Sequence, residues 1–329
     1  MATLAPLLEA FFTDDLMTQR RVSTHTIAAY RDTFRLLLGY TRERTGKTPS
    51  ALDLTDWDAA FISAFLHYLA TDRGNSVTTC NARLAAIHSF FAFTALRVPE
   101  HGGLIQRVLA MPPKRYEHIE VCFLTAEETT AVLAAPDRTT WTGRRDHALL
   151  EVAVQTGLRV SELTALRRQD AHLDAGPHLR CLGKGRKHRV TPLTTTTVAT
   201  LRNWIAERAG EDTDPIFCTR SGRPLSRDAV EHLVAKHTAA AACIMPTLTT
   251  KHVTPHTLRH TAAMALLQAG VDLSVIALWL GHESTHTVQA YLHADMALKE
   301  RALARTAPPD SIPGRFHPPD SLLAFLASL

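Results

Sequence analysis

Apolar side chains recur every three or four positions through the first hundred residues, which is the spacing of one buried helix face. One such stripe runs through Ile27, Phe34 and Leu37, and Ser23 stands where it can cap the helix that the stripe predicts. The pattern predicts four helices here, over residues 4–17, 23–44, 56–74 and 76–98. Helices of this length and number form a small bundle.

The periodic pattern stops between residues 99 and 125. Paired glycines, paired prolines and the basic pair Lys114-Arg115 are typical of an exposed linker. We therefore predict an N-terminal helical domain at residues 1–100, a linker at 101–124, a second domain at 125–306 and a proline-broken tail at 307–329. The tail ends in a short apolar helix candidate, residues 321–329, which could pack on its own chain or on a neighbouring protomer.

The second domain mixes helical spacing with one β-like segment. Thr125 and Glu128 have the spacing of a capping box, which predicts a helix start. Between residues 178 and 193, β-favouring residues flank a turn that contains glycines, a pattern typical of a hairpin. The remaining stripes predict helices over residues 144–155, 160–166, 197–209, 226–242, 258–269, 273–280, 285–291 and 295–304. The predicted fold class is mainly α with a small β-hairpin or sheet (α+β).

Composition narrows the class of protein. The 45% hydrophobic content is ordinary for a folded chain of 329 residues. No apolar run approaches the roughly 20 residues that span a bilayer, and the N-terminus lacks the features of a signal peptide. We therefore expect a cytoplasmic protein without a membrane segment. The five cysteines are scattered without a CxxC pair, which argues against disulfides and against a cysteine zinc site.

Positive charge is modest in total but gathered in places. The formal net charge of +4 is weak support for a nucleic-acid partner by itself. Basic residues cluster at 20–44, at 107–118 and, most densely, at 184–189. Such clusters are the electrostatic signature of a surface that binds phosphate backbones.

Six residues of the second domain have side chains suited to phosphoryl transfer: Arg159, Lys184, His256, Arg259, His282 and Tyr291. Two guanidiniums can hold phosphate oxygens and stabilise transition-state charge. A histidine can exchange a proton, and a lysine can protonate a leaving oxygen. Only about one tyrosine phenol in a thousand is ionised at pH 7, so a nucleophilic tyrosine needs such neighbours. Because these cations do the work of Mg²⁺, we expect no metal or other cofactor.

The motifs around these residues resemble those of the tyrosine recombinases, the phage integrase family. They are, in order, Thr-Gly-Leu-Arg159-x-Ser-Glu-Leu, Gly-Lys184-Gly-x-Lys, His256-x-Leu-Arg259-His, Leu-Gly-His282 and Tyr291. The order and separations both match, and the resemblance covers roughly residues 123–304. Residues 1–100 resemble the core-binding domain of the family less specifically.

The resemblance implies a role for each residue at the phosphate. Arg159 and Arg259 would hold the scissile phosphate, and His282 would hydrogen-bond the phosphoryl group. Glu162 would support the site without reacting.

It also implies the proton and bond transfers. Tyr291 would form a 3′-phosphotyrosyl bond, and His256 would act as acid or base beside it. Lys184 would protonate the leaving 5′-oxygen. Lys187 is the alternative lysine, although contact with the DNA backbone fits it better.

At the level of function, the resemblance implies a site-specific DNA recombinase of the integrase or transposase type. Its partner would be double-stranded DNA, bound by a homo-tetramer on paired sites, and the protein would be a monomer or dimer off DNA. Strand exchange would pass through a Holliday junction without metal or ATP, and mobile-element integration ranks ahead of chromosome-dimer resolution.

Three other interpretations stay open on the residues alone. The same chemistry could relax supercoils, as in a type IB topoisomerase, or the fold could serve a non-catalytic DNA-binding regulator. His252, His256 and His260 also have the i, i+4 spacing of a helical zinc site. Arg259 beside them would repel a cation, which disfavours zinc.

Overall fold

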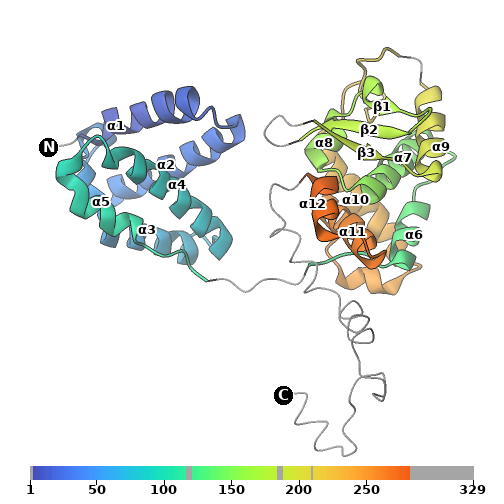
Figure 1. The fold of residues 1–329 in the computed structure, drawn as a ribbon. Coiled ribbons are helices and arrows are strands. Elements are labelled where there is room, and N and C mark those ends of the chain that lie inside the picture. Colours follow the sequence, from blue (N-terminus) through green and yellow to red (C-terminus); the bar gives the residue numbers. More distant parts are fainter. Residues whose placement is uncertain (1–2, 116–120, 184–187, 209, 282–329) are drawn as a thin grey trace, which may run out of the picture. The chain divides into compact units, whose positions relative to one another are not determined.

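The computed structural model describes residues 3–115, 121–183, 188–208 and 210–281 (Figure 1). The chain divides into two compact units, residues 1–118 and residues 119–329. The described part of each unit buries its own hydrophobic core. None of the helices in these ranges is both long enough and apolar enough to cross a bilayer. The helices predicted at 285–291, 295–304 and 321–329 lie outside the described residues.

The first unit is a helical bundle. Its helices are α1 (Leu4–Ala10), a π-helical continuation (Phe11–Gln19), α2 (Thr24–Thr45), α3 (Ala59–Thr71), α4 (Val77–Ala95) and α5 (Gly102–Leu109). Phe11, Phe34 and Phe90 are fully buried at its centre, with ring centroids 5.4 to 6.0 Å apart in edge-to-face pairs. The predicted cap is confirmed, since the Ser23 side chain accepts a backbone N–H three residues on, and Ser76 caps α4 at the predicted start in the same way. The third helix begins after Asp58 instead of at Asp56.

Helix α5 occupies residues that the pattern assigns to the linker. Two glycines at its start lower its helix propensity, and eight residues are too few to show a clear period. Ile105 and Val108, three positions apart, are nonetheless fully buried against the bundle. Tertiary burial therefore stabilises a helix that local propensity does not predict.

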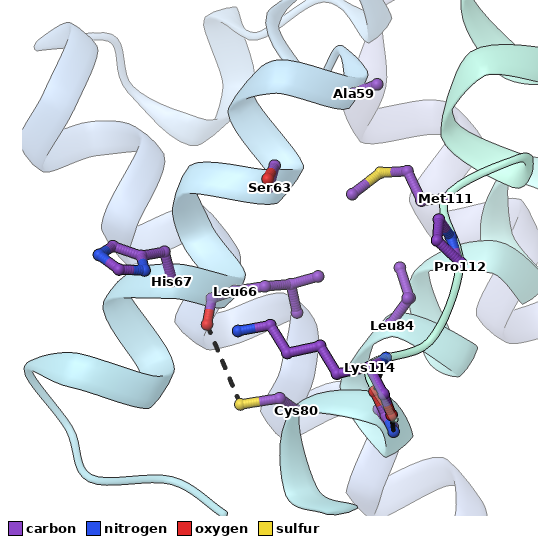
Figure 2. A pocket seen from close by; sticks show the side chains of 10 residues that line it. Ala59, Ser63, Leu66, His67, Cys80, Leu84, Met111, Pro112 and Lys114 are labelled. Carbon is purple, nitrogen blue, oxygen red and sulfur yellow. Dashed lines mark hydrogen bonds between the residues drawn. The ribbon is translucent and has the colours of Figure 1, made fainter. Parts of the chain in front are cut away.

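The chain leaves α5 across a pocket of about 360 Å³ between α3 and α4. Figure 2 shows Lys114 extending its side chain into this pocket. The Asn81 side chain holds the Lys114 backbone at both ends: its amide donates to the carbonyl over 2.8 Å, and its oxygen accepts the N–H over 2.9 Å. These two bonds fix the path of the chain as far as residue 114. None of the candidate site residues lines the pocket.

The second unit surrounds a buried helix and carries a small sheet. Its helices are α6 (Ala126–Ala134), α7 (Trp141–Thr156), α8 (Val160–Ala165), α9 (Thr195–Ala206), α10 (Arg227–Ala242), α11 (Pro255–Gln268) and α12 (Leu273–Leu280). Its strands are β1 (Ala171–His172), β2 (His178–Leu182) and β3 (His188–Pro192), antiparallel in the order β1-β2-β3. The predicted hairpin is confirmed as β2–β3, and the fold is mainly helical with a small sheet, as expected. Strand β1 was not predicted because two residues show no period.

Helix α7 organises this unit. Ala148, Leu149 and Leu150 are consecutive and fully buried, so α7 is covered on more than one face. It packs against α6, α9 and α11 (Figure 1). The C-terminal end of α7 is thereby set beside α11, and the candidate residues begin at that end.

Candidate active site

The turn from α7 to α8 is built on a glycine. Gly157 ends α7 with φ +63°, a left-handed conformation that favours glycine. A Cβ atom there would lie 2.6 Å from Leu280 Cδ2 and 3.1 Å from the Ala262 Cβ. The missing side chain therefore lets the turn, α11 and the end of α12 approach closely. The Trp279 indole N–H adds a bond of 3.1 Å to the Thr156 carbonyl, which holds α12 on the same turn.

We expect Gly157→Ala to destabilise the second unit. The left-handed conformation costs about 1 kcal/mol for alanine, and overpacking against Leu280 adds roughly 1–3 kcal/mol. Gly270→Ala is the matched control, because Gly270 also has positive φ (+83°) but has no atom within 4 Å of an added Cβ. Urea unfolding followed by tryptophan fluorescence measures both variants, since three of the four tryptophans belong to this unit. Equal losses in the two variants would contradict the close packing.

Arg259 is buried between two turns. It lies on α11 with only 2% of its surface exposed. One guanidinium nitrogen donates to the Gly157 carbonyl over 2.6 Å, and the other donates to the Leu280 carbonyl over 2.7 Å. Both carbonyls stand at helix ends, where they lack intrahelical donors. The two bonds therefore orient the guanidinium between the α7–α8 turn and the end of α12.

Arg159 lies on the same turn, two residues after Gly157. Its side chain is 31% exposed, and one nitrogen donates to the Gly281 carbonyl over 3.1 Å. A second nitrogen donates to Glu162 over 3.0 Å, and the Arg159 backbone N–H donates to the other Glu162 oxygen over 2.8 Å. Arg159 is thus braced from two directions while part of its charge faces solvent.

Glu162 is a buried carboxylate with cationic partners on two elements. Besides Arg159 it accepts two bonds of 2.8 Å from the guanidinium of Arg189 on β3. Burial by itself would raise the pKa of Glu162. The hydrogen bonds from Arg189 and from the Arg159 backbone, with both positive charges, instead hold that pKa below its usual range. Glu162 is therefore ionised at neutral pH.

His256 stands one helical turn before Arg259 on α11. Its side chain keeps an exposed surface, and its ring lies edge-on to His260 with centroids 4.2 Å apart. Partial desolvation, followed by the charges of Arg259 and Arg159, lowers the pKa of His256 below its ordinary value. The imidazole is therefore neutral at pH 7 and can accept a proton.

His252, His256 and His260, whose spacing fits a helical zinc site, do not all lie on one helix. Thr254 caps α11 and the helix begins at Pro255, so His252 precedes it. Within the described ranges, no three His, Cys, Asp or Glu side chains form a group that could hold a metal ion. The i, i+4 relation therefore applies to His256 and His260 alone.

Three of the six candidates lie in the described residues, and three do not. Arg159, His256 and Arg259 come together where the α7–α8 turn meets α11 and the end of α12. Lys184, His282 and Tyr291 lie outside the described residues, as does the alternative Lys187. Their roles stay predictions. The three described candidates, Arg159, His256 and Arg259, provide two guanidiniums and a neutral imidazole, a set that can bind and stabilise a phosphate oxyanion.

Two family models match the chain. The model described as "Phage integrase family" matches residues 122–297, and "Phage integrase, N-terminal SAM-like domain" matches residues 10–97. The chain belongs to the phage integrase family of tyrosine recombinases.

Relatives of this tyrosine recombinase match it over most of their length. It is 54% identical over 328 residues to y4rC of Sinorhizobium fredii, whose name describes an integrase/recombinase; the match covers 100% of this chain and 99% of y4rC. It is 34% identical over 299 residues to the tyrosine recombinase XerC of Pelobacter propionicus, covering 89% and 93% of the two chains. A solved structure of the XerH site-specific recombinase bound to palindromic difH shares the fold, with a TM-score of 0.67, 21% identity and coverage of 88% and 82%.

One residue of this recombinase site was missed by the sequence pattern. Arg189 belongs to the densest basic cluster, and nothing in the sequence gives it a role apart from the other cations there. No sequence signal singles out Arg189, because β3 covers Arg189 and Thr191 and exposes Val190, whereas the polarity of these residues predicts the reverse. Because Arg189 lies on the covered side of the strand, its charge needs an anionic partner, and Glu162 is that partner.

Proposed function

We propose that this recombinase cleaves and rejoins DNA at specific sites through a 3′-phosphotyrosyl intermediate, with a Holliday junction between the two strand exchanges. The observation that supports it most directly is the pair Arg159 and Arg259, braced around one turn beside the neutral His256. Two fixed guanidiniums suit the developing charge of a pentavalent phosphorus, because they require little reorganisation as that charge grows.

The proposed cleavage step moves one proton on each side of the phosphorus. The Tyr291 hydroxyl attacks the phosphorus while His256 accepts its proton, and the bond to the 5′-oxygen breaks. Lys184 gives that oxygen a proton. Arg159 and Arg259 bind the non-bridging oxygens throughout. The phosphotyrosyl bond stores the energy of the broken phosphodiester, so rejoining by a second 5′-hydroxyl needs neither ATP nor a metal.

Double-stranded DNA is the proposed partner. The XerH relative is a complex with its difH substrate, and basic residues of this chain gather in both units. We propose that four protomers act on two duplexes, and that the protein is a monomer or dimer off DNA. Integration of a mobile element is the proposed biological setting, and the cytoplasm the proposed compartment.

A nicked suicide substrate tests the proposal. Cleavage beside a nick releases a short strand, which traps the covalent protein–DNA adduct for detection on a denaturing gel. We expect the adduct to form in EDTA. Site binding without adduct would identify a non-catalytic regulator. Relaxation of a supercoiled plasmid that lacks paired sites would favour the topoisomerase interpretation, whereas exchange that requires two sites supports recombination.

Lys184 can be tested through the leaving group. We expect Lys184→Ala to slow cleavage of ordinary DNA strongly, and we expect a substrate with sulfur at the bridging 5′-position to restore the rate. A thiolate leaves without a proton, because thiol pKa values lie far below those of alcohols. Lys187→Ala is the matched control and should behave like wild type on both substrates. Rescue of Lys187→Ala alone would transfer the role of general acid to Lys187.

A further inference from the structure

Arg189 closes a ring of contacts around the candidate site. Its guanidinium meets Glu162 in a two-pronged pair, each nitrogen 2.8 Å from a different carboxylate oxygen. Glu162 also accepts two hydrogen bonds from Arg159, one from its guanidinium and one from its backbone N–H. Each carboxylate oxygen therefore has two donors, and those donors come from two separate places, the N-cap of α8 and strand β3.

The ring also includes the residue at the end of α12. Gly281 has φ +65°, and a Cβ atom there would lie 2.7 Å from an Arg189 guanidinium nitrogen and 3.3 Å from Arg189 Cδ. The Gly281 carbonyl accepts from Arg159. Arg189 thus packs directly on Gly281, which holds one guanidinium nitrogen of Arg159 while Glu162 holds the other.

The position of Arg189 keeps it from serving as a surface cation. Its side chain is only 10% exposed, whereas that of Arg159 is 31% exposed. Arg189 lies opposite Cys181 on β2, and burial raises the pKa of that thiol to about 11, so Cys181 is a neutral thiol at neutral pH. The charged groups that contact Glu162 in the described ranges are Arg159 and Arg189.

We propose that Arg189 is a positioning residue for phosphoryl transfer, which orients Glu162 and Gly281 so that both hold the Arg159 guanidinium toward the scissile phosphate. This inference rests on the proposed function. Arg189 does not touch the DNA; it acts through two groups that fix Arg159. Without it, Glu162 keeps only its bonds to Arg159 and gains freedom to rotate. Misplacement of a catalytic group by about 1 Å can cost roughly 10²-fold in rate.

The test compares Arg189→Met, Glu162→Gln and the double variant in single-turnover cleavage of the suicide substrate. We expect each single variant to cleave roughly 10- to 100-fold more slowly with site affinity within about threefold of wild type. The double variant should be no slower than the slower single variant, because both changes break one unit. The proposal would be overturned if the fold-loss of cleavage rate in the double variant equalled the product of the two single losses, or if Arg189→Met cleaved at nearly the wild-type rate.

A pH profile separates positioning from simple stability. Loss of Arg189 removes two donors and one charge from Glu162, so the pKa of Glu162 rises and protonation begins at higher pH. As the solution is acidified, the cleavage rate of Arg189→Met should therefore begin to fall at a higher pH than the cleavage rate of wild type. The double variant, which has no carboxylate at position 162, should lose this extra fall. An unchanged profile for Arg189→Met would count against the mechanism.

Arg145→Met is the control for loss of a buried arginine. Arg145 makes an equally short pair with the buried Asp146 elsewhere on α7, with bonds of 2.7 and 2.9 Å. It should lower stability without changing the cleavage rate of folded protein. If Arg189→Met does not fold, Arg189→Lys is tested instead. If Arg189→Lys does not fold either, Arg189 is needed for folding and the proposal is overturned. Wild type that forms no adduct would instead refute the proposed function itself.

Discussion

Tyr291→Phe is expected to abolish the covalent adduct while site-specific DNA binding survives. The change removes one hydroxyl and keeps the aromatic ring, so the packing of the side chain is preserved. The other four tyrosines of the chain all lie in the first 116 residues, outside the recombinase motifs. The expected effect is therefore a complete loss of adduct on the suicide substrate, measured beside a gel-shift titration of the same site.

Tyr30→Phe and Tyr68→Phe are the matched controls, because they change tyrosines of the first unit by the same single atom. Both should form the adduct at the wild-type rate. Adduct formation by Tyr291→Phe would eliminate Tyr291 as the nucleophile. Peptide mapping of the covalent protein–DNA adduct would then identify the residue that is linked to the DNA.

Arg259→Lys should slow cleavage by at least roughly 10²–10³-fold, the usual cost of losing one transition-state donor. Lysine keeps the charge but has one nitrogen in place of a fork. A single nitrogen does not reproduce the fork by which Arg259 joins the carbonyls of Gly157 and Leu280, with bonds of 2.6 and 2.7 Å from two different nitrogens. Arg159→Lys should behave similarly, since Arg159 also divides its fork between two acceptors, Glu162 and Gly281.

The measurement is single-turnover cleavage at a temperature well below the unfolding midpoint of each variant, with affinity for the site measured in parallel. Arg145→Lys serves as the control, because Arg145 is also nearly buried and joins a carbonyl, that of Cys218, to a carboxylate. It should keep its cleavage rate. Cleavage by Arg259→Lys within about threefold of wild type would refute the role assigned to the fork.

Hydrophobic periodicity predicted most of this fold because most helices here bury one face. Ser23, Ser76 and Thr125 cap helices where the pattern placed them, and α12 spans the predicted residues 273–280. Prediction was weaker where burial and local propensity disagree. Helix α5 begins with two glycines and is stabilised by the burial of Ile105 and Val108, which no local rule could foresee.

Motifs and periodicity are local properties of the chain, so they were enough to predict the family and the mainly helical fold and to propose six candidate residues. The tertiary structure alone decided how the described candidates are held. Arg259 joins the ends of α7 and α12, and Glu162 joins Arg159 to Arg189. Arg189 and Glu162 are 27 positions apart, and Arg259 and Gly157 are 102 apart. Contacts at such separations depend on how helices pack, and neither periodicity nor motif spacing encodes that packing.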